Sequence, residues 1–302
     1  MTDDPSTHCG FVALVGAPNA GKSTLLNTLV GAKVSIVTHK AQTTRSQIRG
    51  VVTTGSSQLI FIDTPGIFTA SRRLDRAMVE AAWSAAAGAD IVALVIDAVR
   101  GLNPDNEAAI KGLENLRGPK ILIINKIDRK QPQDLLALTE ALNKRMDFAH
   151  TFMVCAQSGE GVADFIKTCH DMAPPGPWHF PEDQLSDLTQ ALTAAEATRE
   201  KLFMRVHDEI PYNTTVETER FQVQKDGSFR IDQVVYVARA SHKKIILGKS
   251  GQTIKAIGME ARKDLSEMFG VPVHLFLFVK VRENWTDKPE HYEEMGLEFP
   301  AK

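Results

Sequence analysis

A lysine and a serine follow two glycines at a spacing that can hold phosphate, in the run GAPNAGKS at residues 16–23. This run has the pattern G-x-x-x-x-G-K-[ST], follows the apolar residues 11–15 and opens a segment with helical periodicity. Glycines at these positions let backbone N–H groups and the N-terminus of the helix face a phosphate. We therefore expect Lys22 to reach the β- and γ-phosphates of a nucleotide and the Ser23 hydroxyl to bind Mg²⁺. The residues of this run expected to contact nucleotide are Gly16, Asn19, Ala20, Gly21, Lys22, Ser23 and Thr24.

A second run, IFIDTPG at residues 60–66, places a carboxylate at the end of a predicted buried strand. There Asp63 can hold Mg²⁺ through water, and the backbone N–H of Gly66 can meet a γ-phosphate. The alternative for residues 16–23 alone is a glycine-rich turn after a strand, which would need no such partner further along the chain. This second run therefore favours a nucleotide site, lined here by Asp63, Thr64, Pro65 and Gly66.

Two further runs could select the base of the nucleotide. In ILIINKID at residues 121–128, Asn125, Lys126 and Asp128 follow a predicted strand, and a carboxylate at Asp128 can accept from the ring N–H and the amine of guanine. Adenine does not offer that edge and would leave the acceptor unpaired, so we expect GTP rather than ATP. The run VCAQSGEG at residues 154–161 supplies a backbone N–H, expected to be that of Ala156, for the guanine oxygen. The residues expected around the base are Asn125, Lys126, Asp128, Cys155, Ala156 and Gln157.

Between the first two runs lies the polar segment THKAQTTR at residues 38–45. A threonine here could complete the Mg²⁺ shell only when a γ-phosphate is present, which would make the segment a switch. Thr43 and Thr44 are both candidates and Thr44 is favoured, while the alternative is that both hydroxyls only satisfy loop backbone. The expected Mg²⁺ ligands are thus Ser23, Thr44 and Asp63, and the expected catalytic set is Lys22, Thr44, Asp63 and Gly66.

A second glycine-rich turn, Gly248-Lys249-Ser250-Gly251, opens another helical pattern in the last third of the chain. Between residues 239 and 263 seven lysines and arginines accompany one acidic residue, although the net charge of the whole chain is −2. KH domains use a Gly-x-x-Gly turn to clamp about four nucleotides of a single RNA strand. The alternative is the capped start of a helix on a basic face. The expected RNA contacts are Lys243, Lys244, Gly248, Lys249, Ser250, Gly251, Ile254 and Lys255, with Ile257 beside them as apolar support for the bases.

The elements that must position these residues fall into two parts. Short apolar runs alternate with helical patterns, which indicates an α/β domain with a mostly parallel sheet and helices on both faces. We expect its strands at 11–16, 58–63, 90–97, 120–125 and 151–156, and its helices after residue 22 and near 74–88, 104–116, 132–146 and 162–171. A small α+β domain then follows, with a helix near 193–209, strands near 214–224 and 230–239, a short helical turn, a helix near 252–269 and a strand at 271–281. The predicted boundaries are a nucleotide domain at 1–173, a proline-rich linker at 174–190 and an RNA-binding domain with its tail at 191–302.

Composition sets the broad class. The 302 residues are 43% hydrophobic and 24% charged, which is typical of a globular protein. No apolar run approaches the roughly 20 residues of a membrane-spanning helix, and the polar N-terminal residues do not predict a secretory signal. The cysteines are odd in number and widely spaced, so we expect free thiols in a reducing cytosol rather than disulfides. Zinc binding by Cys9 with His8, or by Cys169 with His170, lacks the usual Cys-x-x-Cys pattern.

The motifs GAPNAGKS, QTTR, DTPG, NKID and the CAQ of residues 155–157 resemble the five signature boxes of translation-factor-type GTPases. The resemblance implies GTP binding and slow hydrolysis with Mg²⁺. Ile67 stands where many small GTPases carry a glutamine that orients the attacking water, so catalysis should depend on Lys22, Mg²⁺ and backbone donors. Asn19 matches an asparagine that helps to coordinate K⁺ in relatives lacking that glutamine, which makes K⁺ a second candidate cofactor. Cys155 stands where serine is common, a difference of little consequence for a backbone contact.

Residues 196–281 are similar to a type II KH domain, and the two parts joined by a proline-rich linker resemble the Era family. The family implies a ribosome assembly GTPase that binds GTP or GDP, the 3′ end of 16S rRNA and the small (30S) ribosomal subunit. It also implies a cytoplasmic protein with a loose peripheral contact at the inner membrane. The alternative is a weak GTPase that acts as a membrane-associated or cell-cycle scaffold and binds protein through its KH domain.

Overall fold

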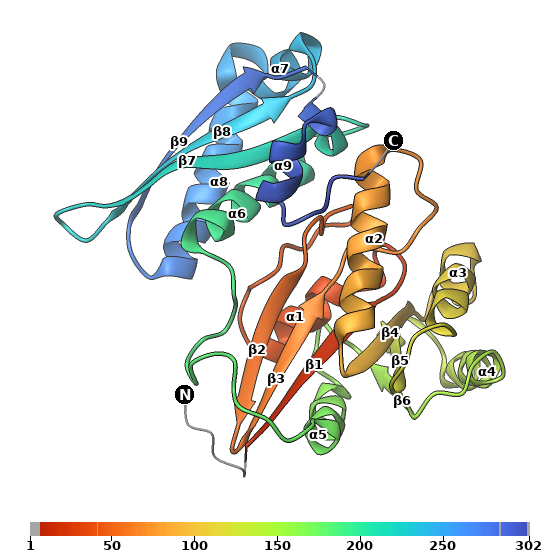
Figure 1. Cartoon of the computed structure of the whole chain (residues 1–302). Helices are drawn as coiled ribbons and strands as arrows, with labels where there is room; N and C mark the ends of the chain where they lie inside the picture. The colour runs from red at the N-terminus through yellow and green to blue at the C-terminus, as the bar shows by residue number, and fades with distance from the viewer. Residues whose placement is uncertain (1–6, 41, 284, 301–302) are drawn as a thin grey trace. The chain divides into compact units, whose positions relative to one another are not determined.

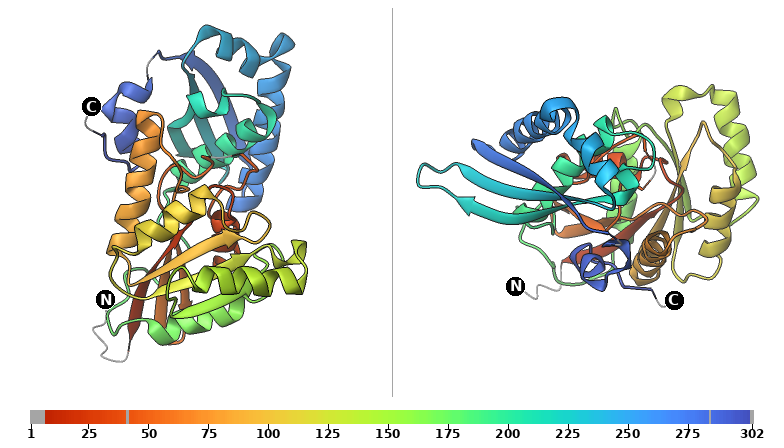
Figure 2. Two further views of the ribbon diagram at one scale, coloured as in Figure 1. Left: turned by 90° about the vertical axis from the view of Figure 1, so that its right-hand side faces the viewer. Right: turned by 90° about the horizontal axis from the view of Figure 1, so that it is seen from above.

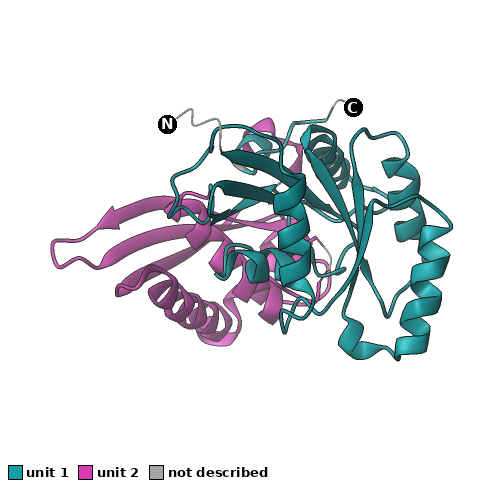
Figure 3. Cartoon of the chain, turned by 90° about the horizontal axis from the view of Figure 1, so that it is seen from below, with its two compact units in different colours: residues 1–35, 44–187, 292–302 teal, residues 36–43, 188–291 magenta. Residues whose placement is uncertain are grey.

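The computed structural model describes residues 7–40, 42–283 and 285–300. The chain forms two compact units (Figure 3). Unit 1 comprises residues 1–35, 44–187 and 292–302, and unit 2 comprises residues 36–43 and 188–291. Both units therefore contain segments that are far apart in the sequence.

A six-stranded sheet forms the centre of unit 1 (Figure 1). Its strand order is β2-β3-β1-β4-β5-β6, and every neighbouring pair is parallel except β2 with β3. The strands are β1 (His8–Val15), β2 (Ile48–Thr54), β3 (Ser57–Asp63), β4 (Ile91–Asp97), β5 (Lys120–Asn125) and β6 (His150–Val154). Five of them were predicted, and the mostly parallel α/β class is confirmed.

Helices cover both faces of this sheet, as Figure 2 shows from a second direction. They are α1 (Lys22–Val30), α2 (Arg73–Gly88), α3 (Pro104–Leu113), α4 (Pro132–Asn143) and α5 (Val162–Met172). Apolar side chains of α2, α3 and α4 form one core with β1, β4 and β5. Helices α1 and α5 pack on the other face, where the Phe165 ring contacts the rings of Phe61 and Phe152. Burial of both faces explains why the strands are almost uninterrupted apolar runs.

The strand register places the polar residues of the site along one edge of the sheet. Asp97 lies opposite Asn125, Asn125 lies opposite Val154, and Asp63 lies opposite Leu14 of β1, two residues before Gly16. The carboxyl ends of parallel strands meet at one edge, where α/β proteins bind their ligands. The sheet therefore brings the predicted phosphate and base motifs together.

The antiparallel edge strand β2 was not predicted. Its sequence, IRGVVTT, carries the β-branched residues typical of a strand, and a short turn at Gly55 (φ 58°) connects it to β3. These β-branched residues and the glycine turn are typical of a hairpin, but the polar segment before them has no pattern that marks where β2 begins.

Residues of the predicted linker form hydrogen bonds with strands β2 and β3. The N–H of Val51 donates to Leu185 O at 2.9 Å, and the buried Gln58 side chain accepts from the N–H groups of His179 and Phe180 at 2.9 and 3.0 Å. Arg49 forms an ion pair with Asp187 at 2.9 Å. These contacts cover the open edge of the sheet, which would otherwise be available to another strand.

Unit 2 contains the small α+β fold in the predicted order. Its elements are α6 (Gln190–Arg205), β7 (Thr214–Val223), β8 (Phe229–Val237), α7 (Ala240–Leu247), α8 (Gln252–Phe269) and β9 (Val273–Val281). The sheet order is β7-β8-β9, with β8 antiparallel to β7 and parallel to β9. Helices α6, α7 and α8 pack on one face of this sheet around a core that includes Phe203, Val235 and Ile257.

The unit boundaries differ from the predicted domains in two further ways. Residues 36–43, which the sequence placed in the nucleotide domain, belong to unit 2 because they contact α6. The tail from Tyr292 onward belongs to unit 1, where the Phe299 ring contacts Tyr292 and lies under the Arg73 guanidinium. Both differences arise from contacts between residues distant in sequence.

The cysteines Cys9, Cys155 and Cys169 are buried free thiols, and burial raises the pKa of Cys9 and Cys169. Their reactive thiolate forms are therefore disfavoured. Within the described residues, no helix combines the length and apolar character that crossing a bilayer requires.

Candidate nucleotide and RNA sites

The loop at residues 16–23 wraps toward the start of α1. Gly21 precedes the helix with φ 98°, a left-handed conformation that suits glycine, and a Cβ added there would lie 2.2 Å from Asn125 Nδ2. Asn19 is also left-handed, with φ 63°. Because glycine has no side chain to cap the helix, the first N–H groups of α1 remain available to an anion.

Lys22 is buried at the floor of this loop. Its ammonium donates to the carbonyl oxygens of Gly16 at 3.0 Å and Ala17 at 3.1 Å. Burial lowers the pKa of Lys22 to about 8, although the nearby Asp63 opposes that change. The protein thus holds an ammonium beside the expected phosphate position with little water to stabilise its charge.

The carboxylate of Asp63 gathers three hydroxyl groups. Its Oδ2 accepts from Ser23 at 2.6 Å, from Ser35 at 2.9 Å and from Thr44 at 3.2 Å, and the Ser23 and Thr44 hydroxyls are themselves 2.9 Å apart. Its Oδ1 is buried without a hydrogen-bond partner. Burial raises the pKa of Asp63, against the lowering effects of Lys22 and these hydroxyls.

These oxygens fit a Mg²⁺ ion. Mg²⁺ prefers oxygen ligands and binds proteins through one or two carboxylates together with substrate phosphates. The unpaired buried Oδ1 of Asp63 and the adjacent Ser23 and Thr44 hydroxyls supply such ligands, either directly or through water. A cation there and a phosphate beside Lys22 would each offset the cost of burying these charges.

The two candidate threonines differ in the partners of their hydroxyl groups. The Thr44 hydroxyl lies in the cluster around Asp63, whereas the Thr43 hydroxyl contacts Thr38 Oγ1 at 2.5 Å and donates to Lys40 O at 2.8 Å. Thr43 therefore stabilises its own loop, and Thr44 remains the candidate Mg²⁺ ligand.

Asn125 connects the phosphate loop to the base site. Its Nδ2 donates to Ala20 O at 2.9 Å, and its Oδ1 accepts from the N–H groups of Lys126 at 2.8 Å and Ala156 at 3.0 Å. The Ala156 N–H is thus paired with the buried carboxamide oxygen of Asn125, and its contact with the guanine oxygen stays a prediction. Asn125 holds the base-site loops together in addition to any contact with nucleotide.

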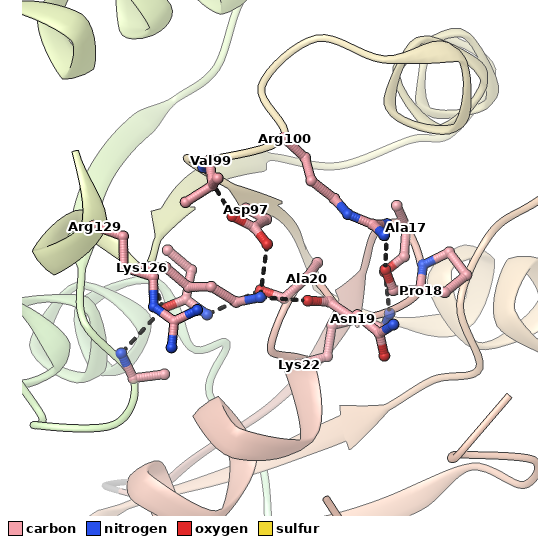
Figure 4. Close-up of polar contacts among 12 residues, drawn as sticks. Ala17, Pro18, Asn19, Ala20, Lys22, Asp97, Val99, Arg100, Lys126 and Arg129 are labelled. Atoms are coloured by element: carbon pink, nitrogen blue, oxygen red, sulfur yellow. Dashed lines mark hydrogen bonds and ion pairs between the residues drawn. The ribbon is translucent and has the colours of Figure 1, made fainter. Parts of the chain in front are cut away.

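Lys126 bridges two further elements (Figure 4). Its ammonium donates to Asn19 O at 2.7 Å and forms an ion pair with Asp97 Oδ2 at 2.6 Å. Asp128, in the turn after β5, keeps its side chain about half exposed (48%), and the Arg129 guanidinium lies 3.8 Å from its carboxylate. Asp128 is therefore accessible to a base, whereas the Lys126 ammonium is held by the protein.

Two other predicted nucleotide contacts, Thr64 and Cys155, also form hydrogen bonds within the protein. The Thr64 hydroxyl donates to Leu14 O at 2.7 Å, so it fastens β3 to β1 and leaves only the backbone of Thr64 to face a phosphate. Cys155 is buried and its N–H donates to Glu160 O at 3.0 Å, while Gln157 is exposed. The Ile67 side chain lies in the core of unit 1 and its N–H donates to Gly16 O at 3.0 Å. No side chain at position 67 can therefore orient a water molecule.

The Gly-x-x-Gly turn of unit 2 has the geometry expected for close approach. Gly248 has φ 72° and ψ 178°, and a Cβ added there would lie 2.2 Å from Thr253 Oγ1. Gly251 precedes α8 with φ 76° and offers no side-chain cap to the 18-residue helix. The start of α8 thus presents uncapped N–H groups, as does the start of α1.

The predicted basic side chains surround this turn. Lys249 and Ser250 are exposed within it, and Lys244 and Lys255 are exposed on α7 and α8, with Lys243 partly exposed. In the part of the chain that the structure describes, these four lysines form no ion pair, unlike Lys201 and Lys263 of the same unit. Ile254 is partly buried beside them, but the prediction for Ile257 is wrong because that side chain is fully buried in the core.

Comparison with known proteins identifies both units. Residues 11–126 match the family model described as a 50S ribosome-binding GTPase, and residues 209–286 match that of the KH domain. GTPase Era of Bradyrhizobium diazoefficiens is 56% identical over 297 residues, covering 98% of this chain and 96% of its own. GTPase Era of Rhizobium meliloti is 57% identical over 294 residues, covering 97% and 94%.

The chain belongs to the Era family of GTPases. Its fold agrees with a crystal structure of Era in complex with MgGDPNP and nucleotides 1506–1542 of 16S ribosomal RNA, with a TM-score of 0.91 and 37% identity over 96% of this chain and 99% of that chain. It agrees equally with Aquifex aeolicus Era bound to GDP and AlF4⁻, with a TM-score of 0.90 and 36% identity over the same shares. The predicted family, its GTPase activity and its KH domain are thus confirmed.

Sequence reasoning missed several residues of this Era-family site. Ser35 donates to Asp63, Asp97 pairs with Lys126, and the Thr28 hydroxyl donates to Ala156 O at 2.6 Å. Asp97 ends a predicted strand in the same way as Asp63, so its position gave a usable signal. Ser35 and Thr28 carry no spacing pattern, and only the folded chain brings them to the site.

Protonation of Lys22 should control how nucleotide affinity depends on pH. With its pKa near 8, Lys22 of the free protein loses its proton as the pH rises above that value, while a bound phosphate would keep the ammonium protonated to higher pH. Affinity for a GTP analogue should therefore be insensitive to Lys22 below pH 7 and fall by up to about tenfold per pH unit above pH 8. Fluorescence titration with a labelled analogue between pH 6.5 and 9.5 measures this fall.

Lys22→Arg provides the comparison, because a guanidinium stays protonated across that range. The variant should bind the analogue more weakly but with a flat pH profile. Parallel profiles for the wild type and the variant would show that another group titrates.

Proposed function

We propose that this GTPase binds the 3′ end of 16S rRNA and assists assembly of the small (30S) ribosomal subunit. The observation that carries the proposal is that one chain holds two helix starts without a side-chain cap after glycine turns. One lies beside Lys22 and Asp63, and the other lies beside four lysines that form no ion pair with the residues that the structure describes. The first suits the phosphates of one nucleotide, and the second suits the backbone of a strand. The structure of an Era relative with MgGDPNP and 16S rRNA supports the same pairing of ligands.

In the nucleotide site, the N–H groups of residues 19–24 and the Lys22 ammonium would bind the β- and γ-phosphates. Ser23, Thr44 and Asp63 would hold Mg²⁺, which when bound would supply charge stabilisation to the phosphates. The backbone of Thr64, Pro65 and Gly66 follows Asp63 on the γ-phosphate side, and Ile67 N–H fixes this turn to Gly16. Thr44 would contact Mg²⁺ only with a γ-phosphate present, which would make it the sensor of GTP.

Hydrolysis in this site would depend on positioning and electrostatics. With Ile67 buried in the core, no side chain there orients the attacking water. Lys22, Mg²⁺ and backbone N–H groups are left to stabilise the charge that develops on the γ-phosphate. A low intrinsic turnover follows from this arrangement.

We also propose that K⁺ assists hydrolysis at Asn19, as the family resemblance implies. The left-handed Asn19 lies in the phosphate loop, and its carbonyl oxygen is fixed by Lys126. Equal turnover in potassium and sodium buffers of the same ionic strength would exclude this role.

Asp128 should select guanine through its exposed carboxylate. Replacing it by Asn exchanges one acceptor oxygen for an amide donor. The Asp128→Asn variant should therefore lose about 2–3 kcal/mol of GTP binding, because guanine loses a hydrogen bond to a charged acceptor, and it should gain affinity for XTP. Competition of GTP, XTP and ATP against a labelled analogue measures the change. Unaltered preference for GTP in the variant would remove Asp128 from the base site.

In the RNA site, the Gly248–Gly251 turn would bind the phosphate backbone of a single strand. Lys243, Lys244, Lys249 and Lys255 would neutralise its phosphates, and partly buried Ile254 would lie beside the bases. Among the described residues these lysines have no acidic partner, which leaves their charge available to RNA, in contrast to the paired cations elsewhere in unit 2.

Charge reversal in this turn should weaken RNA binding. Because each neutralised phosphate releases counterions, Lys249→Glu should lower affinity for an oligoribonucleotide from the 3′ end of 16S rRNA by about tenfold and reduce the slope of log K against log salt by about one. Titrations at 50–200 mM salt test both effects.

Lys225→Glu is the matched control, since it makes the same change of charge at the exposed β7–β8 turn. It should leave both the affinity and the slope nearly unchanged. Equal losses for the two variants would indicate a general electrostatic effect, and no RNA binding by the wild type would instead favour the alternative of a protein-binding scaffold. The cytoplasmic location and the peripheral contact with the inner membrane remain predictions from the family.

A further inference from the structure

Helix α6 of unit 2 buries charged residues in an unusual way. Arg199 and Glu200 are 2% and 1% exposed, although they occupy consecutive positions of a helix whose apolar side chains, such as Leu202 and Phe203, pack into the core of unit 2. Buried charges are costly unless they are paired. Their charged partners are Glu196 and Lys201 of the same helix. Each also binds a backbone group of the segment at residues 36–43, the loop between Ser35 and Thr44.

Arg199 binds the C-terminal end of this segment. Its Nη2 donates to Thr43 O at 2.5 Å, and its Nε donates to Glu196 at 2.8 Å, which orients the guanidinium. The same guanidinium lies 5.2 Å from the centre of the Phe203 ring. Its Nη1 is buried without a hydrogen-bond partner, so displacement of Thr43 would leave still more of the group unsatisfied.

Two more contacts fix the rest of the segment. Glu200 accepts from the N–H of Val37 at 2.9 Å. The Lys40 ammonium donates to the carbonyl oxygens of Phe203 and Val206 at the C-terminal end of α6, where helical carbonyls lack partners and the dipole favours a cation. The segment is thus bound to α6 near both of its ends and at its middle.

The residues that flank the segment both bind Asp63. Ser35, immediately before it, and Thr44, immediately after it, donate to the same carboxylate oxygen at 2.9 and 3.2 Å. The peptide bond between Thr43 and Thr44 therefore joins a carbonyl held by Arg199 to a side chain at the expected Mg²⁺ position. A movement of α6 must therefore either carry Thr43 with it, which displaces Thr44, or break the hydrogen bond between Arg199 and Thr43.

We propose that Arg199 is a positioning residue for the γ-phosphate state: it acts through the Thr43–Thr44 peptide to place the Thr44 hydroxyl for Mg²⁺. The inference rests on the role of Thr44 given in the proposed function. It makes α6, a helix of the RNA-binding unit, part of the apparatus that distinguishes GTP from GDP. Thr44 is needed only when a γ-phosphate is bound, so the effect of Arg199 should depend on the nucleotide.

The test is a double-mutant cycle between Arg199→Met and Thr44→Val in the full chain. Affinities for a non-hydrolysable GTP analogue and for GDP are measured with saturating Mg²⁺. Loss of the charged hydrogen bond should weaken the analogue by about tenfold and GDP by less than about twofold. In the Thr44→Val background, Arg199→Met should add less than about twofold, because the residue through which it acts is already lost.

Arg205→Met is the control on the same helix. The Arg205 side chain is 41% exposed and pairs with Glu260 rather than with residues 36–43, so neither affinity should change. If Arg199→Met does not fold, as thermal denaturation would show, Arg199→Lys replaces it; lysine keeps the charge but not the fork of donors, and the same selective loss should follow in smaller measure.

The outcomes separate the inference from the function beneath it. Equal losses for the analogue and GDP, or full additivity with Thr44→Val, would overturn the role of Arg199 alone. If Thr44→Val itself leaves affinity for the analogue unchanged, the proposed Mg²⁺ role of Thr44 is wrong and the inference fails with it.

Discussion

One buried carboxylate, that of Asp63, joins the parts of this protein that must act together. It ends strand β3, accepts a hydroxyl hydrogen bond from the first turn of α1, and binds Ser35 and Thr44, the unit 1 residues that flank the segment 36–43 of unit 2. Burial raises the pKa of Asp63, so its ionised form needs these donors or a cation. An ion that replaces the hydroxyl contacts would therefore act on the phosphate loop and on the segment held by α6 at the same time.

The two glycine turns apply the same physics to different ligands. Each ends in a left-handed glycine that starts a helix without a side-chain cap, which leaves N–H groups and a positive helix end for phosphate. What differs is the surrounding charge. Lys22 is buried near the carboxylate of Asp63, which suits one compact polyphosphate with a metal ion. The lysines around Gly248–Gly251 are mostly exposed and form no ion pair with other described residues, which suits the backbone of a nucleic acid strand.

The sequence predicted the features that depend on local pattern. Apolar runs marked five strands of unit 1, and the order of elements in unit 2 followed from periodicity and turns. The phosphate and base motifs could be placed because parallel strands end at a common edge. The sequence left both Thr43 and Thr44 as candidates, with Thr44 favoured. The choice depends on which hydroxyl the folded loop turns toward Asp63.

Features that depend on distant contacts escaped prediction. Residues 36–43 lie near the phosphate loop in sequence, yet Arg199 and Glu200, more than 150 positions away, bind them. The hydrogen bond from the Ala156 N–H to the buried Asn125 oxygen was also not predicted, and a contact of Ala156 with guanine stays a prediction. Ile257 has the helical spacing of a groove residue and instead fills the core. In each case a buried polar or apolar group is satisfied by a partner that no local spacing reveals.

If Arg199 positions Thr44 as proposed, nucleotide state and RNA binding are coupled through the segment between Ser35 and Thr44. The most direct measurement is the Kd of a 16S 3′-end oligoribonucleotide for the protein saturated with a Mg²⁺–GTP analogue and with Mg²⁺–GDP, at one salt concentration. Linkage predicts values that differ by about fivefold or more. Identical Kd values in the two states would contradict this coupling, because the γ-phosphate would then have no influence on the affinity for RNA.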